Sequence, residues 1–325
     1  MIVVSKDAPH LNERRRSEHG QEQELFNWMD HQWQMGGASA FMDISQLSLA
    51  RVPRALTIAG SDSSGGAGIQ ADIKTFQECG AYGMSVITAI TSQNTNGVRD
   101  VHVIPVEHIV SQIDAVQEDI VPDAIKTGML VDEVTIRTIS DKMKAFGWSN
   151  VVVDPVMIAK GGASLLSLSA IDTLRKELLP LTTIVTPNIP EAEVLANMKI
   201  HTFEDRIQAA ARIHANGVPY VFIKGGHDNT WSTCDDLLYD GSATWWFSSE
   251  RRITPHTHGT GCTISAAMTA FLAGGASVAQ AVLLAKQFVY AAIREPLNIG
   301  HGHGPVNHWA HRQRNAKGRD YDKSN

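Results

Sequence analysis

Two glycine-rich segments contain the residues most suited to chemistry. The first, GSDSSGGAGIQAD, covers residues 60–72, and its four glycines permit close approach of the backbone to a ligand. No Gly-Lys-Ser/Thr follows, so the segment is not a P-loop. The second, HGTGCT, covers residues 258–263 and opens an expected helix. Because the first N–H groups of a helix lack partners within the helix, this segment predicts a site for negative charge, such as that of a transferred phosphoryl group.

Two side chains in these segments are candidates for direct roles. Cys262 lies near a helix start, where we expect a lowered thiol pKa. It would then accept a proton or contact the substrate; a small buried cysteine is the alternative, and spacing does not choose among these. Asp72 shares a helix face with Ile69, Ile73 and Phe76, where a carboxylate is costly unless it is paired or faces a pocket. We expect Asp72 to contact a ligand rather than to make only a structural hydrogen bond.

Further candidates follow two other apolar runs. Asn188 and Glu191 offer the hard oxygen atoms that suit Mg²⁺, although Glu191 also fits a first-turn helix charge. Lys224, in the segment KGGH at 224–227, supplies an ammonium group for phosphate or for a solvated strand end. Residues 160–162, Lys-Gly-Gly, have the glycines that a mobile lid needs.

Many of these residues directly follow short apolar runs, and the strands formed by those runs must position them. Such runs, separated by amphipathic helical stretches, predict a mostly parallel sheet covered by helices on both faces. The six expected strands are residues 55–59, 85–90, 124–126, 151–153, 183–185 and 220–223. Each ends in polar or glycine residues, at the sheet edge where ligands bind in open parallel sheets. Residues 235–239 and 244–247 predict an antiparallel hairpin that forms the edge of the sheet.

The composition excludes several classes of protein. A chain of 325 residues that is 43% hydrophobic is not disordered, and a net charge of −6 argues against a nucleic-acid-coating protein. No apolar run approaches the roughly 18 residues of a membrane span, and no signal-peptide region opens the chain. The three widely spaced cysteines do not suggest a disulfide framework. We therefore expect a cytoplasmic protein without membrane or nucleic-acid partners.

Taken together, these segments resemble the hydroxymethylpyrimidine kinase / phosphomethylpyrimidine kinase family of thiamine biosynthesis, which has the ribokinase-like fold. The resemblance runs from Ala55 to about Trp309. Its motifs are AGSDSSGGAGIQAD at 59–72, SQNTNGV at 92–98, KTGML at 126–130, VVDPVM at 152–157, TPNIPEAE at 186–193, KGGH at 224–227, HGTGC at 258–262 and GHGPVNHW at 302–309. It implies a three-layer α/β/α sandwich with a central, mostly parallel sheet.

The resemblance also implies an activity. ATP phosphorylates the alcohol of 4-amino-5-hydroxymethyl-2-methylpyrimidine, and a second phosphorylation of the monophosphate gives the diphosphate. Relatives are commonly dimers, so a homodimer is expected. The implied pyrimidine contacts are Gly60, Ala67, Asp72, Met129, Val156 and above all Gln93, whose amide pairs with a ring nitrogen and the amino group.

The same resemblance assigns the phosphate-transfer residues. Glu191 and Asn188 act around Mg²⁺, with Lys224 and Gly226 near the phosphates of ATP. The segment Gly259-Thr260-Gly261 forms an anion hole, and Cys262 stands where sugar-kinase relatives carry an aspartate base. A cysteine fits the role of general base less well unless its pKa falls, so positioning and charge stabilisation supply most of the catalysis.

Two alternatives and one segment stay open. The family overlaps in sequence with bacterial pyridoxal kinases, so a pyridoxal or pyridoxine kinase is the first alternative; a non-catalytic pyrimidine-binding module is the second. The expected kinase domain spans residues 54–311, with a polar C-terminal tail at 312–325. Residues 1–53 are expected to form a loosely ordered extension, with a possible short helix at 25–35.

Overall fold

The computed structural model describes residues 2–9, 51–157, 166–228 and 232–311. Residues 10–50 of the expected N-terminal extension, the glycines of residues 160–162 and the tail at 312–325 lie outside these residues. The described elements, in chain order, are β1 (Ile2–Ser5), β2 (Arg54–Asp62), α3 (Gly68–Glu78), β3 (Tyr82–Asn94), β4 (Gly97–Val103), α4 (Val106–Asp119), β5 (Ala124–Thr127), α5 (Glu133–Phe146), β6 (Val151–Val153), α6 (Leu168–Thr173), η2 (Leu174–Leu178), η3 (Leu179–Leu181), β7 (Ile184–Val185), α7 (Ile189–Ala196), α8 (Phe203–His214), β8 (Tyr220–Ile223), η4 (Gly225–His227), β9 (Thr233–Tyr239), β10 (Thr244–Glu250), α9 (Thr260–Ala273) and α10 (Val278–Arg294).

The strands form one sheet in the order β1-β10-β9-β8-β7-β6-β5-β2-β3-β4. Its centre, from β3 to β8, is parallel and contains all six predicted strands. Five of these strands are nearly fully buried between the two helical layers, which explains why their sequences are continuous apolar runs, whereas in β3 buried residues alternate with more exposed ones. β4 was not predicted; it pairs antiparallel with β3 and is mostly exposed.

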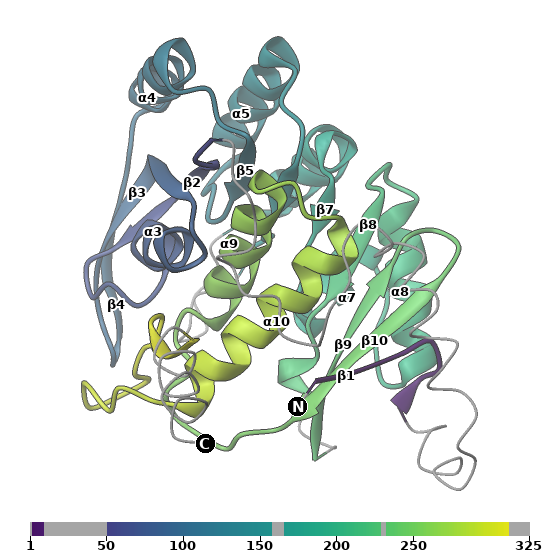
Figure 1. The fold of residues 1–325 in the computed structure, drawn as a ribbon. Coiled ribbons are helices and arrows are strands. Elements are labelled where there is room, and N and C mark those ends of the chain that lie inside the picture. The colour runs from purple at the N-terminus through teal and green to yellow at the C-terminus, as the bar shows by residue number, and fades with distance from the viewer. Residues whose placement is uncertain (1, 10–50, 158–165, 229–231, 312–325) are drawn as a thin grey trace, which may run out of the picture.

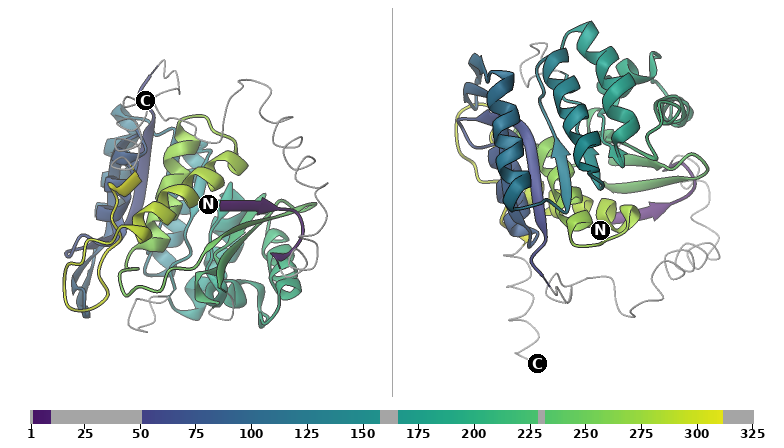
Figure 2. Two further views of the ribbon diagram at one scale, coloured as in Figure 1. Left: turned by 60° about the horizontal axis from the view of Figure 1, so that its bottom comes forward. Right: turned by 90° about the horizontal axis from the view of Figure 1, so that it is seen from above.

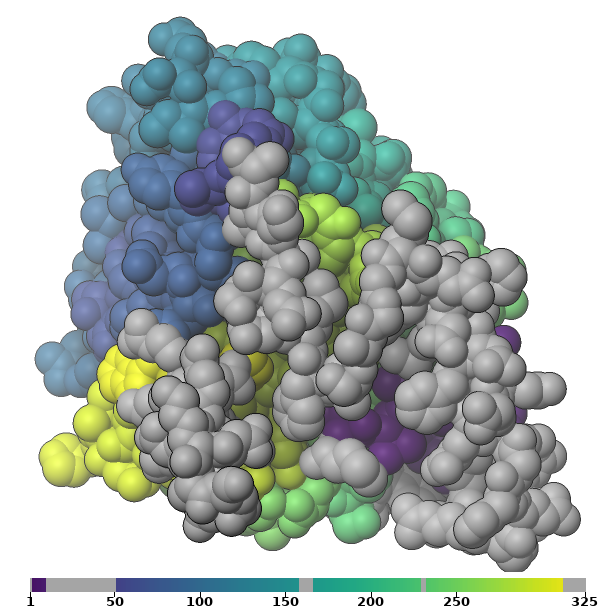
Figure 3. All heavy atoms as spheres, in the orientation of Figure 1, coloured from purple at the N-terminus to yellow at the C-terminus, as the bar shows by residue number. Residues whose placement is uncertain are grey.

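The predicted hairpin is present, but it does not form the edge of the sheet. β9 and β10 pair antiparallel from Thr244↔Tyr239 to Glu250↔Thr233. β1 then pairs antiparallel with β10 and takes the edge position, so the expectation of a loosely ordered extension is wrong for residues 2–5. Val4 packs against the apolar cluster beneath α9 and α10, and Figure 3 shows β1 in purple on the face of the molecule where α10 also lies.

Helices cover the two faces of the sheet and complete the predicted three-layer α/β/α sandwich. α3, α9 and α10 pack on one face, where Phe76, Phe271 and Phe288 belong to one apolar cluster. α4 to α8 pack on the other face, around a second cluster that includes Ile113 and Ile139. Figures 1 and 2 show α9 and α10 in yellow-green on their side of the sheet. Within the described residues, no helix is both long and apolar enough to cross a membrane.

Candidate active site

A cavity of about 710 Å³ lies at the carboxyl ends of the parallel strands. Because β2, β3, β5, β6, β7 and β8 all end at this edge, their terminal residues meet around one space. The cavity brings together thirteen of the fourteen predicted site residues: Gly60, Ala67, Gln93, Met129, Val156, Asn188, Glu191, Lys224, Gly226, Gly259, Thr260, Gly261 and Cys262.

Asp72 is the exception, because it lies behind the cavity wall. Its side chain is fully buried, and Oδ2 accepts hydrogen bonds from Thr57 Oγ1 at 2.7 Å and from Lys126 Nζ at 2.8 Å. Burial raises the pKa of Asp72, and the neighbouring Lys126 ammonium opposes that shift. The expected ligand contact is therefore not present in this structure. Lys126, which no sequence argument selected, lines the cavity in its place.

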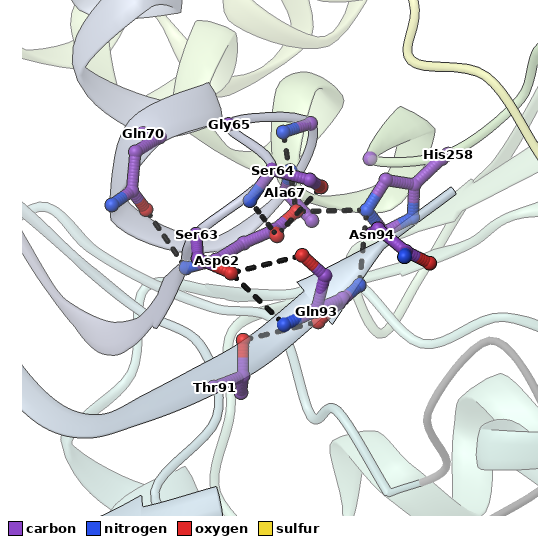
Figure 4. Close-up of polar contacts among 12 residues, drawn as sticks. Asp62, Ser63, Ser64, Gly65, Ala67, Gln70, Thr91, Gln93, Asn94 and His258 are labelled. Atoms are coloured by element: carbon purple, nitrogen blue, oxygen red, sulfur yellow. Dashed lines mark hydrogen bonds and ion pairs between the residues drawn. The ribbon is translucent and has the colours of Figure 1, made fainter. Parts of the chain in front are cut away.

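The first glycine-rich segment is folded around the side chain of Asp62. Oδ1 accepts hydrogen bonds from the N–H and hydroxyl of Ser64, and Oδ2 accepts from the N–H groups of Gly66 and Ala67 (Figure 4). His258 Nε2 lies 2.8 Å from the same Oδ2. Although burial favours the neutral acid, the hydrogen bonds from His258 and Ser64 lower the pKa of Asp62 to about 2. Asp62 is therefore a carboxylate that shapes this loop.

The second glycine-rich segment opens α9 at the floor of the cavity. Gly259 has a φ of 79°, and a Cβ there would lie 1.8 Å from the carbonyl oxygen of Gly66. Glycine is thus required where the two loops touch. Thr260, Gly261 and Cys262 occupy the first turn of α9 and line the cavity. This turn presents N–H groups and the positive end of the helix dipole to a bound anion.

The expected lowering of the Cys262 pKa is wrong. Burial raises the pKa of the thiol to about 11; the Lys126 ammonium lowers it, while Asp72 and Asp154 add to the rise. A helix start favours a thiolate only when desolvation does not outweigh it. In this structure Cys262 is a neutral thiol at physiological pH.

A group of charges lies where β6, β7 and β8 end. Lys224 Nζ lies 2.8 Å from Asp154 Oδ1 and 3.9 Å from Glu191 Oε2. Burial lowers the pKa of Lys224, but the two carboxylates more than compensate, so that it is raised. Burial raises the pKa of Glu191 to about 7. Two carboxylates share one ammonium, which leaves room for a further positive charge.

Asn188 and Glu191 hold each other in place at the start of α7. Glu191 N–H donates to Asn188 Oδ1 at 2.9 Å, and Asn188 N–H donates to Glu191 Oε2 at 2.8 Å. This capping box supports the reading of Glu191 as a helix charge. Glu191 also lines the cavity, so the two readings of this residue do not exclude each other.

The far end of the cavity was not predicted from the sequence. Lys286 of α10 donates to Asp236 Oδ2 at 2.6 Å, and Asp236 Oδ1 accepts from the N–H of Gly225 at 2.7 Å. Ile264, Val289 and Ile293 add apolar wall in this part of the molecule. Apart from Gly225, these residues belong to β9, α9 and α10, and their ordinary strand and helix patterns gave no signal of a site.

The chain is similar in sequence and in structure to known kinases. A family model described as phosphomethylpyrimidine kinase matches residues 62–307. The hydroxymethylpyrimidine/phosphomethylpyrimidine kinase of Bacillus subtilis is 52% identical over 257 residues, which cover 79% of this chain and 95% of that protein. A thiamine biosynthesis bifunctional protein of Geobacter sulfurreducens is 46% identical over 275 residues, covering 83% of this chain and 56% of that protein. Among solved structures, the ADP complex of Bacillus subtilis pyridoxal kinase aligns with a TM-score of 0.75 and 43% identity, covering 81% of this chain and all of that one.

Proposed function

The chain belongs to the phosphomethylpyrimidine kinase family, and we propose on this premise that it phosphorylates 4-amino-5-hydroxymethyl-2-methylpyrimidine with ATP. The hydroxymethyl oxygen attacks the γ-phosphorus, the bond to the β–γ bridging oxygen breaks, ADP leaves and the hydroxyl proton is released. A second transfer to the monophosphate gives the diphosphate for thiamine biosynthesis.

The observation that carries this proposal is the shared cavity of the two glycine-rich loops. Its lining includes an amide and two apolar side chains, which we assign to one end, and the start of α9 with Lys224, which we assign to the other. An alcohol held at the first end would reach a phosphoryl group bound at the second. Orientation of two reactants in this way supplies a large part of catalysis in phosphoryl transfer.

The pyrimidine end is formed by Gln93, Met129 and Val156. The Gln93 amide offers both a donor and an acceptor, as an aminopyrimidine edge requires. A Cβ at Gly60 would lie 2.5 Å from Met129 Cε, so glycine at position 60 lets the methionine form the wall. Ala67 begins the helix that closes this end.

The phosphate end is formed by the anion hole, Gly259-Thr260-Gly261, together with Lys224. The N–H groups and the ammonium would stabilise charge on the transferred group. Gly226 has no atom within 4 Å of an added Cβ, which leaves open space beside the phosphates of ATP. Lys286 and the apolar residues beyond it would hold the rest of the nucleotide.

Magnesium fits the carboxylates of this site. Mg²⁺ uses one or two protein carboxylates together with waters and phosphate oxygens. Glu191 and Asp154 meet that need, and among the described residues no group of three histidine, cysteine or acidic side chains offers a protein-only metal site. Glu191, with Asn188 ordering it, would hold the ion, whose charge offsets that of the phosphates.

Cys262 is proposed to contact the hydroxymethyl group as a neutral thiol rather than to take its proton. A thiol with a pKa of about 11 is almost entirely protonated at neutral pH. Catalysis then depends mainly on orientation and on the anion hole. The protein is further proposed to act as a cytoplasmic homodimer that does not bind nucleic acid.

A pyridoxal kinase is the second candidate, because several similar solved structures are of pyridoxal kinases. Purified protein incubated with ATP and Mg²⁺ and either alcohol distinguishes the candidates by the rate of ADP release. The proposal expects the pyrimidine alcohol to have the higher kcat/KM; phosphorylation of pyridoxal alone would overturn it. Binding of the pyrimidine without ADP release would instead indicate a non-catalytic binding module.

A further inference from the structure

His258 joins three separate elements at the pyrimidine end of the cavity. Its backbone precedes the anion hole, and its imidazole Nε2 lies 2.8 Å from Asp62 Oδ2 in the first glycine-rich loop. The amide group of Gln93, at the end of β3, lies 3.2 Å from the same nitrogen. The side chain is 6% exposed. Figure 4 shows the imidazole between the loop and the Gln93 strand.

The position of one proton follows from these contacts. Asp62 is ionised at neutral pH, since its pKa is about 2. A carboxylate only accepts hydrogen bonds, so the nearby Nε2 of His258 must carry a hydrogen. An Nε2–H cannot also accept a hydrogen bond from the Gln93 NH₂ group. The atom of Gln93 that faces His258 is therefore its oxygen, which shares the Nε2–H with Asp62 Oδ2 as the longer and weaker arm of a three-centre hydrogen bond; the two orientations of an amide have nearly the same shape and differ in their hydrogens.

The neighbouring threonine agrees with this orientation. Thr91 Oγ1 lies 3.0 Å from the Ser61 carbonyl oxygen and 3.2 Å from the other end of the Gln93 amide. With the amide oxygen on this side, its single hydroxyl hydrogen would have to be divided between two oxygens, and both amide hydrogens would face the His258 N–H. If the Gln93 NH₂ group faces Thr91, the amide donates to the hydroxyl and the hydroxyl donates to Ser61. Every hydrogen in the group then has an acceptor.

The backbone of Gln93 is held by the same loop. Gln93 N–H donates to Ser63 Oγ at 2.9 Å, and the Ser63 hydroxyl donates to the Gln93 carbonyl at 2.9 Å. The loop thus fixes the main chain of Gln93, and His258 with Thr91 fixes the direction of its amide. The amide oxygen and nitrogen each keep one further hydrogen-bonding capacity for a ligand in the cavity.

We propose that His258 is a positioning residue: held by Asp62, its Nε2–H fixes the Gln93 amide so that the donor and the acceptor face the substrate ring in a set order. This inference rests on the proposed function, since it concerns recognition of the aminopyrimidine. An aminopyrimidine presents a ring nitrogen, which accepts a hydrogen bond, beside an amino group, which donates one. If the Gln93 amide were reversed, its NH₂ group would face the amino group and its oxygen would face the ring nitrogen. His258 therefore contributes to selection of the pyrimidine without contacting the reacting atoms.

The test measures binding of the pyrimidine alcohol by calorimetry and the steady-state kinetics of its phosphorylation. His258→Leu removes the donor and should raise the pyrimidine Kd about tenfold, with the KM for ATP changed less than about twofold. His258→Gln places an N–H near the Nε2 position and should recover most of the affinity. In the Gln93→Ala background, His258→Leu should add less than about twofold, because it acts through an amide that is no longer there.

His308→Leu is the matched control. His308 is 3% exposed and contacts Thr263 of α9 through Nε2 at 3.1 Å, but it does not line the cavity. Its replacement should lower the melting temperature without changing the pyrimidine Kd. An unchanged Kd in folded His258→Leu, a full effect of His258→Leu in the Gln93→Ala background, or no recovery with His258→Gln would overturn the inference. Wild-type protein that neither binds nor phosphorylates the pyrimidine would instead refute the proposed function, and this inference with it.

Discussion

Replacement of Cys262 by alanine or serine tests whether this residue takes the proton of the substrate alcohol. The side chain lines the cavity directly after the anion hole, which is where a base would stand. Its thiol, however, has a pKa of about 11, because desolvation and the nearby Asp72 and Asp154 carboxylates outweigh the opposing effect of the Lys126 ammonium. The geometry and the charge state thus point to different roles, and kinetics can separate them.

The size of the effect follows from the pKa. At pH 7.5 the thiol lies about 3.5 pH units below its midpoint, so roughly one molecule in 3,000 carries a thiolate. Forming that thiolate costs on the order of 5 kcal/mol. A mechanism that needs it would speed up about tenfold for each pH unit, and the loss of a general base would reduce kcat by about 10²–10⁴. A neutral contact is worth one ordinary hydrogen bond, or less than about tenfold.

The assay is kcat for the pyrimidine alcohol at saturating ATP, followed from pH 6 to pH 9.5 in the wild type and both variants. We expect a loss of less than about tenfold in Cys262→Ala and a smaller loss in Cys262→Ser, with the same pH profile in all three proteins. A drop of 10² or more, together with a wild-type rate that climbs with pH and a variant rate that does not, would refute the neutral-thiol role.

Three further predictions concern stability and backbone geometry. Burial raises the pKa of Glu191 from 4.5 to about 7, so its ionisation destabilises the folded state as the pH rises from 4.5 through 7. At pH 8, Glu191→Gln should therefore be more stable to urea than the wild type, by on the order of 1–3 kcal/mol of unfolding free energy. This difference should vanish towards pH 4.5, and kcat of the variant should fall. Equal urea midpoints at pH 8 would contradict this. Gly259→Ala forces a Cβ against Gly66 and should lower kcat by at least about 10², whereas Gly147→Ala, at a φ of 61° in open space, should cost only about 1 kcal/mol in urea unfolding and leave kcat unchanged. Deletion of residues 1–9 removes β1 and exposes the edge of β10. The shortened protein should have a lower melting temperature and scatter more light than the full chain, because an unpaired edge strand promotes aggregation. A shortened protein that melts and scatters light as the wild type does would show that β1 does not protect this edge.

The parts of the fold predictable from sequence were those set by local pattern. Strands such as β5 and β6 are buried on both faces, so each is a short apolar run that the sequence displays directly. β1 has no such context: whether residues 2–5 form a strand depends on the free edge of β10, more than 200 residues away in the chain. The β9–β10 hairpin was predicted, but its pairing with β1 could not be.

Site residues that directly follow strands were predictable from the sequence. Residues whose role depends on burial against distant parts of the chain were less predictable. Helical spacing correctly put Asp72 on the buried face of α3 but could not show that Lys126 would meet it there. The expectation of a lowered Cys262 pKa took only the helix start into account. Desolvation by the surrounding elements reversed the direction of the pKa shift. Asp62 and His258 went unselected because their pairing joins two distant loops. A polar residue at a strand end, such as Asp62, was the one signal available.

Analysis of the reaction products tests the central claim most directly. Wild-type protein is incubated with ATP, Mg²⁺ and 4-amino-5-hydroxymethyl-2-methylpyrimidine, and the products are followed over time by mass spectrometry. The account predicts that the monophosphate forms first and is then converted to the diphosphate, with one ADP released at each step. Failure to form either phosphate under conditions in which the protein phosphorylates another alcohol, such as pyridoxal, and releases ADP from ATP would contradict it.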